Sequence, residues 1–149
     1  MKKKLFIYYT LTGNGDVVKD TFKDKGYEIR KVISKSKYPK NLFLLMMIGG
    51  FKATFNKKDK LIDFNTDISK YDKIVISSPI WNDRLCAPIN SVINLLDLKD
   101  KDISFILHSA SGNANHAKEK IKNLYGIDSI ILKEPKKHKE ELIKLKDID

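Results

Sequence analysis

Residues 4–15 read Lys4-Leu5-Phe6-Ile7-Tyr8-Tyr9-Thr10-Leu11-Thr12-Gly13-Asn14-Gly15. The first half is a run of aromatic and branched side chains, which is typical of a buried β-strand. The second half is polar and rich in glycine, and residues 16–25 after it carry Val18 and Phe22 four positions apart, as on one helix face. Gly26 marks the end of that helix. The stretch therefore predicts a strand that turns through a glycine loop directly into a helix.

The same alternation of strand and helix runs along the rest of the chain. Further strands are predicted at 27–33, 73–77, 102–108 and 128–132, and further helices at 88–96, 113–125 and 137–148. Residues 42–55 are predicted as a helix interrupted by Gly49-Gly50, with Met46-Met47 filling the core. Alternating β and α elements favour a parallel sheet covered by helices on both faces. We expect residues 1–149 to form a single domain, a three-layer α/β/α sandwich with a five-stranded parallel sheet.

The chain of 149 residues is strongly basic, with a formal net charge of +10. Only Arg30 and Arg84 are arginines, and the lysines are spread along the whole chain. Proteins that read nucleic acid depend on arginine forks, so we expect no nucleic-acid partner. The one cysteine, Cys86, fits a reducing compartment. The apolar runs at 5–9 and 42–48 are too short for a signal peptide or a membrane span, so we expect a cytoplasmic protein without membrane contact.

Residues 10–15 bring two hydroxyls, an amide and two glycines to the start of a helix. A helix N-terminus offers unpaired N–H groups and a partial positive charge, and glycines let the backbone wrap closely around an anion. The hydroxyls of Thr10 and Thr12 and the amide of Asn14 are further donors. The loop therefore favours a phosphate held without lysine or arginine. The alternative is a tight turn in which Thr or Asn only caps the helix.

Two further strand ends carry candidate site residues. Residues 77–82 hold Trp81, the only tryptophan, whose indole suits stacking against a flat and mostly apolar ring, or else simply covers the sheet edge. Residues 108–113 are small and polar, which leaves room for a ligand. Ligands of parallel α/β sheets lie beyond the carboxyl ends of the strands. We therefore expect all three segments to meet at one crevice.

These segments resemble one known family. Thr10-Leu11-Thr12-Gly13-Asn14-Gly15 after an apolar strand resembles the T-x-T-G-N-T phosphate loop of flavodoxins, with Gly15 in place of the usual threonine. Ser78-Pro79-Ile80-Trp81, followed by Ala87-Pro88, resembles a ring-contacting segment of small flavodoxin-like proteins, although Asn82-Asp83-Arg84 replaces smaller residues there. Ser111-Gly112 matches part of a Ser-Gly-Gly type loop, and Gly49-Gly50-Phe51-Lys52 is similar to a stretch of that family to which we assign no chemical role.

The resemblance implies a flavodoxin-like fold with strand order 2-1-3-4-5 and FMN as the cofactor. The phosphate would lie in the first loop and the isoalloxazine ring against the other two. The implied cofactor-binding residues are Thr10, Leu11, Thr12, Gly13, Asn14, Gly15, Pro79, Ile80, Trp81, Asn82, Ser109, Ala110, Ser111, Gly112 and Asn113. The implied function is that of an electron carrier, which needs no catalytic side chain. Flavodoxin surfaces are typically acidic and this chain is basic, so we expect an acidic redox partner protein, and a monomer or weak dimer.

Two alternatives use the same fold. An NAD(P)H-dependent FMN or quinone reductase would need a groove for the nicotinamide beside the ring, and the chain shows no added dinucleotide motif. A flavin-free binding module on this fold stays an alternative because of Gly15 and the polar run at 82–84.

The three histidines and the single cysteine are the remaining side chains with chemistry of their own. His108 is either a proton donor to a reduced flavin or, as we expect, a strand-end residue with a satisfied hydrogen bond. His116 and His138 are expected at the surface. Cys86 precedes a helix start, where a thiol can become acidic, but we expect it only to pack. These four residues lack metal-ligand spacing, so no metal is expected.

Overall fold

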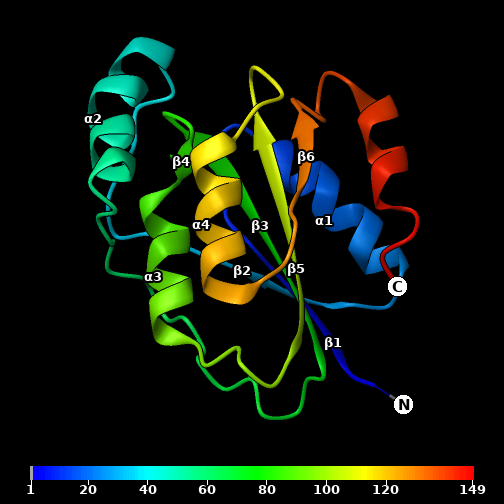
Figure 1. Ribbon diagram of the computed structural model, residues 1–149. Helices are drawn as coiled ribbons and strands as arrows, with labels where there is room; N and C mark the ends of the chain where they lie inside the picture. The colour runs from blue at the N-terminus through cyan, green and yellow to red at the C-terminus, as the bar shows by residue number, and fades with distance from the viewer. Residues whose placement is uncertain (1) are drawn as a thin grey trace.

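The computed structural model describes residues 2–149 and shows a parallel α/β fold (Figure 1). The strands are β1 (Lys4–Tyr8), β2 (Glu28–Lys31), β3 (Lys73–Trp81), β4 (Arg84–Leu85), β5 (Asp102–Ser109) and β6 (Ile130–Lys133). The helices are α1 (Asn14–Asp24), α2 (Leu42–Thr54), α3 (Ala87–Leu95), α4 (Asn115–Tyr125) and the 3-10 helix η1 (Lys139–Leu145).

Five strands run parallel in the order β2-β1-β3-β5-β6, and the two-residue β4 pairs antiparallel with the end of β3. Without β4, this is the predicted order 2-1-3-4-5, so the predicted fold class is confirmed. The strand order reverses between β1 and β3, which places the expected ligand crevice at the carboxyl ends of these two strands.

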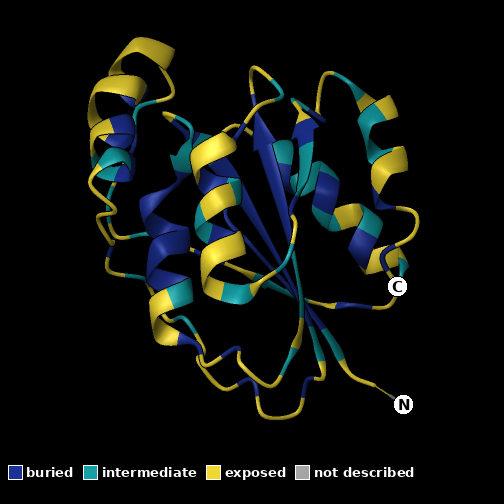
Figure 2. Cartoon of the chain, in the orientation of Figure 1, coloured by how far each residue is buried: buried dark blue, intermediate teal, exposed yellow. Residues whose placement is uncertain are grey.

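The sheet carries a separate core on each face because side chains alternate along a strand. Leu5 and Ile7 of β1 belong to the core under α2, α3 and α4, whereas Phe6 and Tyr8 belong to the core that α1 and η1 cover. Figure 1 shows α2, α3 and α4 on one side of the sheet and α1 and η1 on the other, and Figure 2 shows the central strands buried between them.

β3 is longer than the sequence pattern predicts and continues to Trp81 instead of ending at Ser77. Ser78 and Pro79 still pair with β5, but β1 ends opposite Ser77. Pro79 therefore has a strand neighbour on one side only, where its missing N–H is tolerated. Residues 78–81, which we expected to form a loop, instead lead into a hairpin in which Trp81 pairs with Arg84.

α2 also differs from the prediction. Its backbone runs unbroken through Gly49-Gly50, and the side chain of Asn41 caps its start by accepting hydrogen bonds from the N–H groups of Phe43 and Leu44 at 3.0 and 3.2 Å. The prediction that Met46-Met47 fills the core is wrong, because both side chains are mostly exposed. The last helix is 3-10 in form, and its residue Leu145 is fully buried. None of the helices within residues 2–149 has the length and apolar content to cross a membrane.

Candidate functional site

The turn after β1 is organised around the hydroxyl of Thr10. Its Oγ1 accepts hydrogen bonds from the N–H groups of Gly13 at 3.1 Å and Gly15 at 3.0 Å. A threonine hydroxyl that accepts two bonds keeps its own proton for donation. The N–H groups of Thr12, Asn14 and Asp16 make no hydrogen bond to any residue of 2–149. The turn thus offers several unused donors at the N-terminus of α1, which is the arrangement that binds anions.

Steric constraints explain why positions 13 and 15 of this turn are glycines. Gly13 has a φ of +98°, a backbone conformation that other residues seldom adopt. A Cβ atom on Gly15 would lie 2.8 Å from Cβ of Thr10 and 3.0 Å from a ring carbon of Tyr8. The departure from the threonine usual in flavodoxins therefore reflects close packing, since Thr10 and Tyr8 occupy the space a side chain would need.

A lysine that the sequence analysis missed lies on this turn. The N–H of Lys136 donates to Oδ1 of Asn14 at 3.0 Å, and Nζ of Lys136 donates to the carbonyl of Thr12 at 3.3 Å. We expected the turn to hold an anion without lysine or arginine, and the structure adds a positive charge to it. Lys136 follows β6, so its place beyond the end of a neighbouring parallel strand was the signal that could have identified it.

The ends of β3 and β5 enclose a cavity of about 260 Å³ together with α2. Its lining is Leu42, Leu45, Met46, Ile80, Trp81, Asn82, Asp83, Ser109, Ala110, Ser111 and Asn113. Seven of these residues are among the predicted cofactor-binding residues. The residues not predicted are Asp83 and the three apolar side chains of α2, whose segment the sequence left without a role. The combination of an apolar wall with a few polar groups is typical of small-molecule sites.

Trp81 forms a fixed part of the cavity wall, because only 7% of its surface is exposed. Its ring centroid lies 6.0 Å from that of Tyr9, in an edge-on arrangement, and 4.7 Å from that of Tyr38. Since Tyr9 immediately precedes Thr10, this contact joins the cavity to the phosphate-loop candidate. Gly49 of α2 lies so close that a Cβ there would come within 2.9 Å of the indole.

The turn between β6 and η1 links the remaining predicted residues. The N–H of Glu134 donates to the carbonyl of Ser109 at 3.1 Å, and the side chain of Lys133 lies over Gly112. With the contacts of Lys136 described above, this turn touches both the loop after β1 and the loop after β5. Gly112 and Pro79 support these loops without lining the cavity. Apart from Gly112 and Pro79, the predicted residues thus fall into two adjoining groups, residues 10–15 and the cavity lining.

A buried carboxylate fixes α2 over the cavity. Asp59 accepts hydrogen bonds from Lys52 of α2 at 2.8 Å, from Ser34 at 2.8 Å and from Tyr38, whose ring packs on Trp81. Burial disfavours the charged form of Asp59, but the hydrogen bonds outweigh it and hold the pKa of this carboxyl below its usual value. This charged cluster, together with the buried side chains of Leu45 and Ala53, holds α2 in place.

His108 and Cys86 are both inaccessible. Burial lowers the pKa of His108 to about 4, and its Nε2 atom has no hydrogen-bond partner in residues 2–149. The expectation that His108 has a satisfied hydrogen bond is wrong for Nε2, and the lowered pKa disfavours the imidazolium form that would donate a proton. Burial raises the pKa of Cys86 to about 12, so the expectation that Cys86 only packs is confirmed. His116 and His138 lie at the surface as expected.

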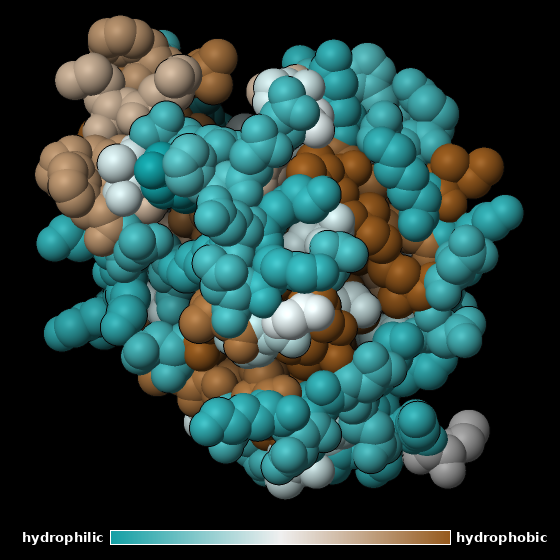
Figure 3. Space-filling model, viewed as in Figure 1, coloured by the Kyte–Doolittle hydropathy of each residue, from teal (hydrophilic) through white to brown (hydrophobic). Residues whose placement is uncertain are grey.

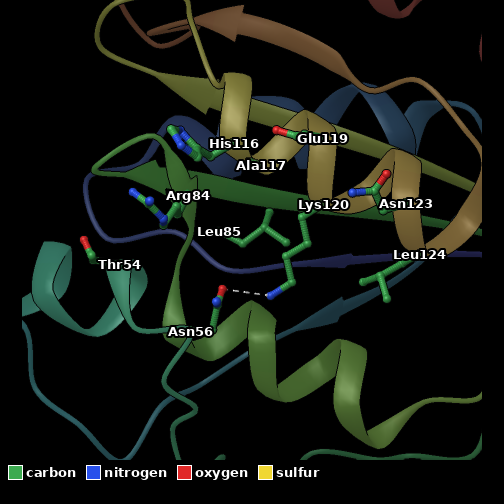
Figure 4. A pocket seen from close by; sticks show the side chains of 10 residues that line it. All are labelled: Thr54, Asn56, Arg84, Leu85, His116, Ala117, Glu119, Lys120, Asn123 and Leu124. Carbon is green, nitrogen blue, oxygen red and sulfur yellow. Dashed lines mark hydrogen bonds between the residues drawn. The ribbon is translucent and has the colours of Figure 1, made fainter.

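A second cavity, of about 480 Å³, lies on the other side of the β3–β4 turn (Figure 4). Arg84 and Lys120 line it, and neither forms an ion pair with a carboxylate of residues 2–149. Lys120 reaches across from α4 and donates to Oδ1 of Asn56 at 3.2 Å and of Asn90 at 3.0 Å. Burial, together with Lys58, lowers the pKa of Lys120. Glu119 also lines this cavity, so two cationic side chains face it beside one carboxylate, in contrast to the apolar wall of the cavity under α2.

No family model matches the chain, and no curated protein matches it. Several solved structures do match the chain. A flavoprotein of Lactobacillus acidophilus NCFM, solved in complex with FMN, is 21% identical with a TM-score of 0.68, over 94% of this chain and 98% of that chain. Flavoprotein candidates from Bacteroides eggerthii and Bacteroides uniformis are 18% and 19% identical, with TM-scores of 0.73 and 0.71. The match to the Bacteroides eggerthii structure covers 97% of this chain and 96% of that protein. The match to the Bacteroides uniformis structure covers 89% of this chain and 90% of that protein. At these identities the likeness establishes the fold.

Proposed function

We propose that the chain is an FMN-binding, flavodoxin-like electron-transfer protein. One observation carries the proposal: the segments after β1, β3 and β5 adjoin at one end of the sheet, joined by the contact between Tyr9 and Trp81. The structural neighbour solved with FMN supports the choice of cofactor. When bound, FMN supplies the redox chemistry, and the protein supplies binding and orientation.

The residues present fit a phosphate and a flat apolar ring. The unpaired N–H groups of Thr12, Asn14 and Asp16, with Nζ of Lys136 beside them, would hold the phosphate. The apolar side of the cavity, contributed by Ile80, Trp81 and α2, would exclude water from the ring. The hydroxyls of Ser109 and Ser111 and the amides of Asn82 and Asn113 supply polar partners for its heteroatoms. None of these groups must gain or lose a proton.

A visible absorption titration tests this proposal. The protein is incubated with FMN, freed of excess and compared with riboflavin, which lacks the phosphate. We expect retained flavin bands with FMN and weak retention of riboflavin. Equal retention of both would contradict the role of residues 10–15, and no retention of either would reject the cofactor.

The second cavity favours one alternative function, an NAD(P)H-dependent reductase. Arg84 and Lys120 could receive the phosphates of a nicotinamide dinucleotide, and the β3–β4 turn between the two cavities would bring the nicotinamide toward the ring. The test is NADPH oxidation by the FMN-loaded protein with Lys120→Gln as the variant and Lys118→Gln, on the same helix, as the control. Turnover whose KM for NADPH rises only in Lys120→Gln would favour the reductase, whereas no turnover favours the carrier.

A further inference from the structure

The outer side of α2 is apolar although nothing in residues 2–149 covers it. Its mostly exposed large apolar side chains are Leu42, Phe43, Leu44, Met46, Met47, Ile48 and Phe51, and Phe55 follows at the helix end. In Figure 3 the surface over α2, at the upper left, is tan to light brown, which marks it as apolar, and a separate brown area lies nearer the middle of the view. Scattered exposed apolar residues are normal on a protein, but a contiguous patch of this kind marks an interaction site.

The patch is more than the cavity wall seen from outside. Leu42, Leu45 and Met46 line the cavity, but Met47, Phe51 and Phe55 are not among its lining residues. Taking the ordinary 3.6 residues per turn, Leu44, Met47, Ile48, Phe51 and Phe55 fall within about 100° of arc on the side opposite the buried Leu45, Gly49 and Ala53. No charged residue lies in that arc. A surface helix of this composition is expected to be covered by something apolar.

Lysines flank α2 in the chain on both sides. Residues 29–58 contain no Asp or Glu. Exposed lysines precede and follow α2, at positions 35, 37 and 40 on one side and 57, 58 and 60 on the other. None of these six lysines forms an ion pair with a carboxylate within the described part of the chain. The covering surface must therefore be apolar at its centre and negative around it.

We propose that α2 docks on an anionic lipid bilayer and lies in its interface, with its apolar side toward the acyl chains and the flanking lysines among the headgroups. A helix that lies in the interface needs far fewer residues than one that crosses it. Each lysine near an anionic surface strengthens binding about fivefold. The spacing of Leu44, Ile48, Phe51 and Phe55 would also suit a helix of a second copy. Charge argues against that occupant, because a two-fold pair would bring like-charged lysines together.

Co-sedimentation with vesicles tests the proposal on the full chain. Vesicles of phosphatidylcholine mixed with phosphatidylglycerol are compared with vesicles of phosphatidylcholine alone, at low and high salt. We expect binding to the anionic vesicles only, weakened by salt. Met47→Gln with Phe51→Gln should reduce binding by about tenfold or more, because two exposed apolar anchors are lost. The matched control is Leu124→Gln with Ile143→Gln, which changes exposed apolar residues on α4 and η1 and should leave binding within about twofold.

Charge is tested separately. Lys57→Gln with Lys58→Gln should weaken binding to the anionic vesicles by about tenfold or more. Lys118→Gln with Lys139→Gln lowers the net charge of the protein by the same amount and should weaken binding clearly less. Circular dichroism verifies that each variant is folded. Absence of binding to the anionic vesicles, or equal losses in variants and controls, would overturn the proposal. So would a dimer in sedimentation velocity that dissociates in Met47→Gln with Phe51→Gln, because a second copy would then cover α2. The experiment needs no FMN, so its outcome is independent of the proposed function.

Discussion

The two sides of the candidate crevice are built on opposite principles. The turn after β1 is polar and held by local hydrogen bonds, with Thr10 accepting from two backbone groups within five residues of itself. α2 is apolar and held from a distance, through a buried carboxylate and a contact between a glycine and an indole. A locally bonded turn keeps its shape if the rest of the fold loosens, whereas a helix fixed at a few points can shift as a unit. We therefore expect the two sides to respond very differently to substitution.

The largest effect is expected from Asp59→Ala, which removes the carboxylate that fixes α2. It leaves the hydroxyls of Ser34 and Tyr38 without their charged acceptor, and a hydrogen bond to a charged group contributes about 1.5–3 kcal/mol, so the expected loss is about 3 kcal/mol or more. Urea unfolding monitored by circular dichroism measures the free energy of unfolding. Asp100→Ala, an exposed residue with no side-chain hydrogen bond in the described chain, is the control and should change little.

The same variant has a pH signature. The pKa of Asp59 is lower in the folded state than in the unfolded chain, so its contribution is fully present above the unfolded pKa of about 4. The contribution is lost as the pH falls through the folded pKa. The difference in unfolding free energy between wild type and Asp59→Ala should therefore be constant near pH 7 and shrink below about pH 4. A difference independent of pH would mean that the side chain acts by packing alone.

A smaller effect is expected from Gly49→Ala, for which Gly50→Ala is the natural counterpart. A Cβ at position 49 would meet Cε3 of Trp81 at 2.9 Å, so Gly49→Ala should lower the unfolding free energy by about 1–3 kcal/mol. A Cβ at position 50 meets only Cβ of Asn82, at 3.5 Å, and alanine favours a helix by about 1 kcal/mol over glycine. Gly50→Ala should thus be neutral or stabilising in thermal unfolding. Equal destabilisation by both would show that α2 is not seated on Trp81.

In the turn after β1, substitution of Thr10 should affect stability, whereas substitution of Thr12 should affect ligand binding. Thr10→Val removes the acceptor of two backbone N–H groups and should cost about 1–2 kcal/mol in urea unfolding. Thr12 is exposed and its hydroxyl makes only a 3.5 Å contact with the side chain of Asn14, so Thr12→Val should leave stability unchanged. If the proposed function holds, Thr12→Val should instead weaken FMN binding by about tenfold in the absorption titration. The reverse assignment would mean that the hydroxyl of Thr12, not that of Thr10, organises the turn.

The smallest effect is expected from Lys136→Gln. Its ammonium group is near the surface, so stability should change by less than about 0.5 kcal/mol. FMN affinity should fall by about fivefold at low salt and hardly at all at high salt, because an exposed charge is screened. Lys137→Gln, whose partner is Glu134, is the matched control and should have no such effect. A loss of affinity that salt does not diminish would assign Lys136 a role in shaping the turn.

The fold could be predicted from the sequence because the central strands are short apolar runs that alternate with helices having one apolar face, whereas the edge strand β2 (Glu28–Lys31) has only one apolar residue. Val18 and Phe22 are fully buried, as their spacing indicates. The end of β3 could not be predicted, because Pro79 suggests a loop unless it is known that β1 ends two residues earlier. That fact depends on the register between strands, which no local pattern contains.

The crevice could be predicted only in part, for the same reason. Its loops follow strands and are visible as runs of small polar residues. Lys136 resembles every other lysine in a chain that has lysines throughout, and its place on the turn after β1 is a tertiary contact. The role of α2 was missed because its apolar composition suggests a buried helix, whereas most of its large side chains are exposed. The composition of α2 shows that its apolar side chains need an apolar neighbour, but it does not show which neighbour covers them.

The position of Trp81 makes the protein its own optical probe. As the chain's single indole, it is the dominant source of intrinsic fluorescence, and it touches α2 at Gly49 as well as the ring of Tyr9. Displacement of α2 would expose the indole to water and shift its emission to longer wavelength. A yellow chromophore in the adjacent cavity would instead quench it by energy transfer. The two events on the two sides of the crevice are thus distinguishable by the colour and the intensity of one emission band, without any attached dye.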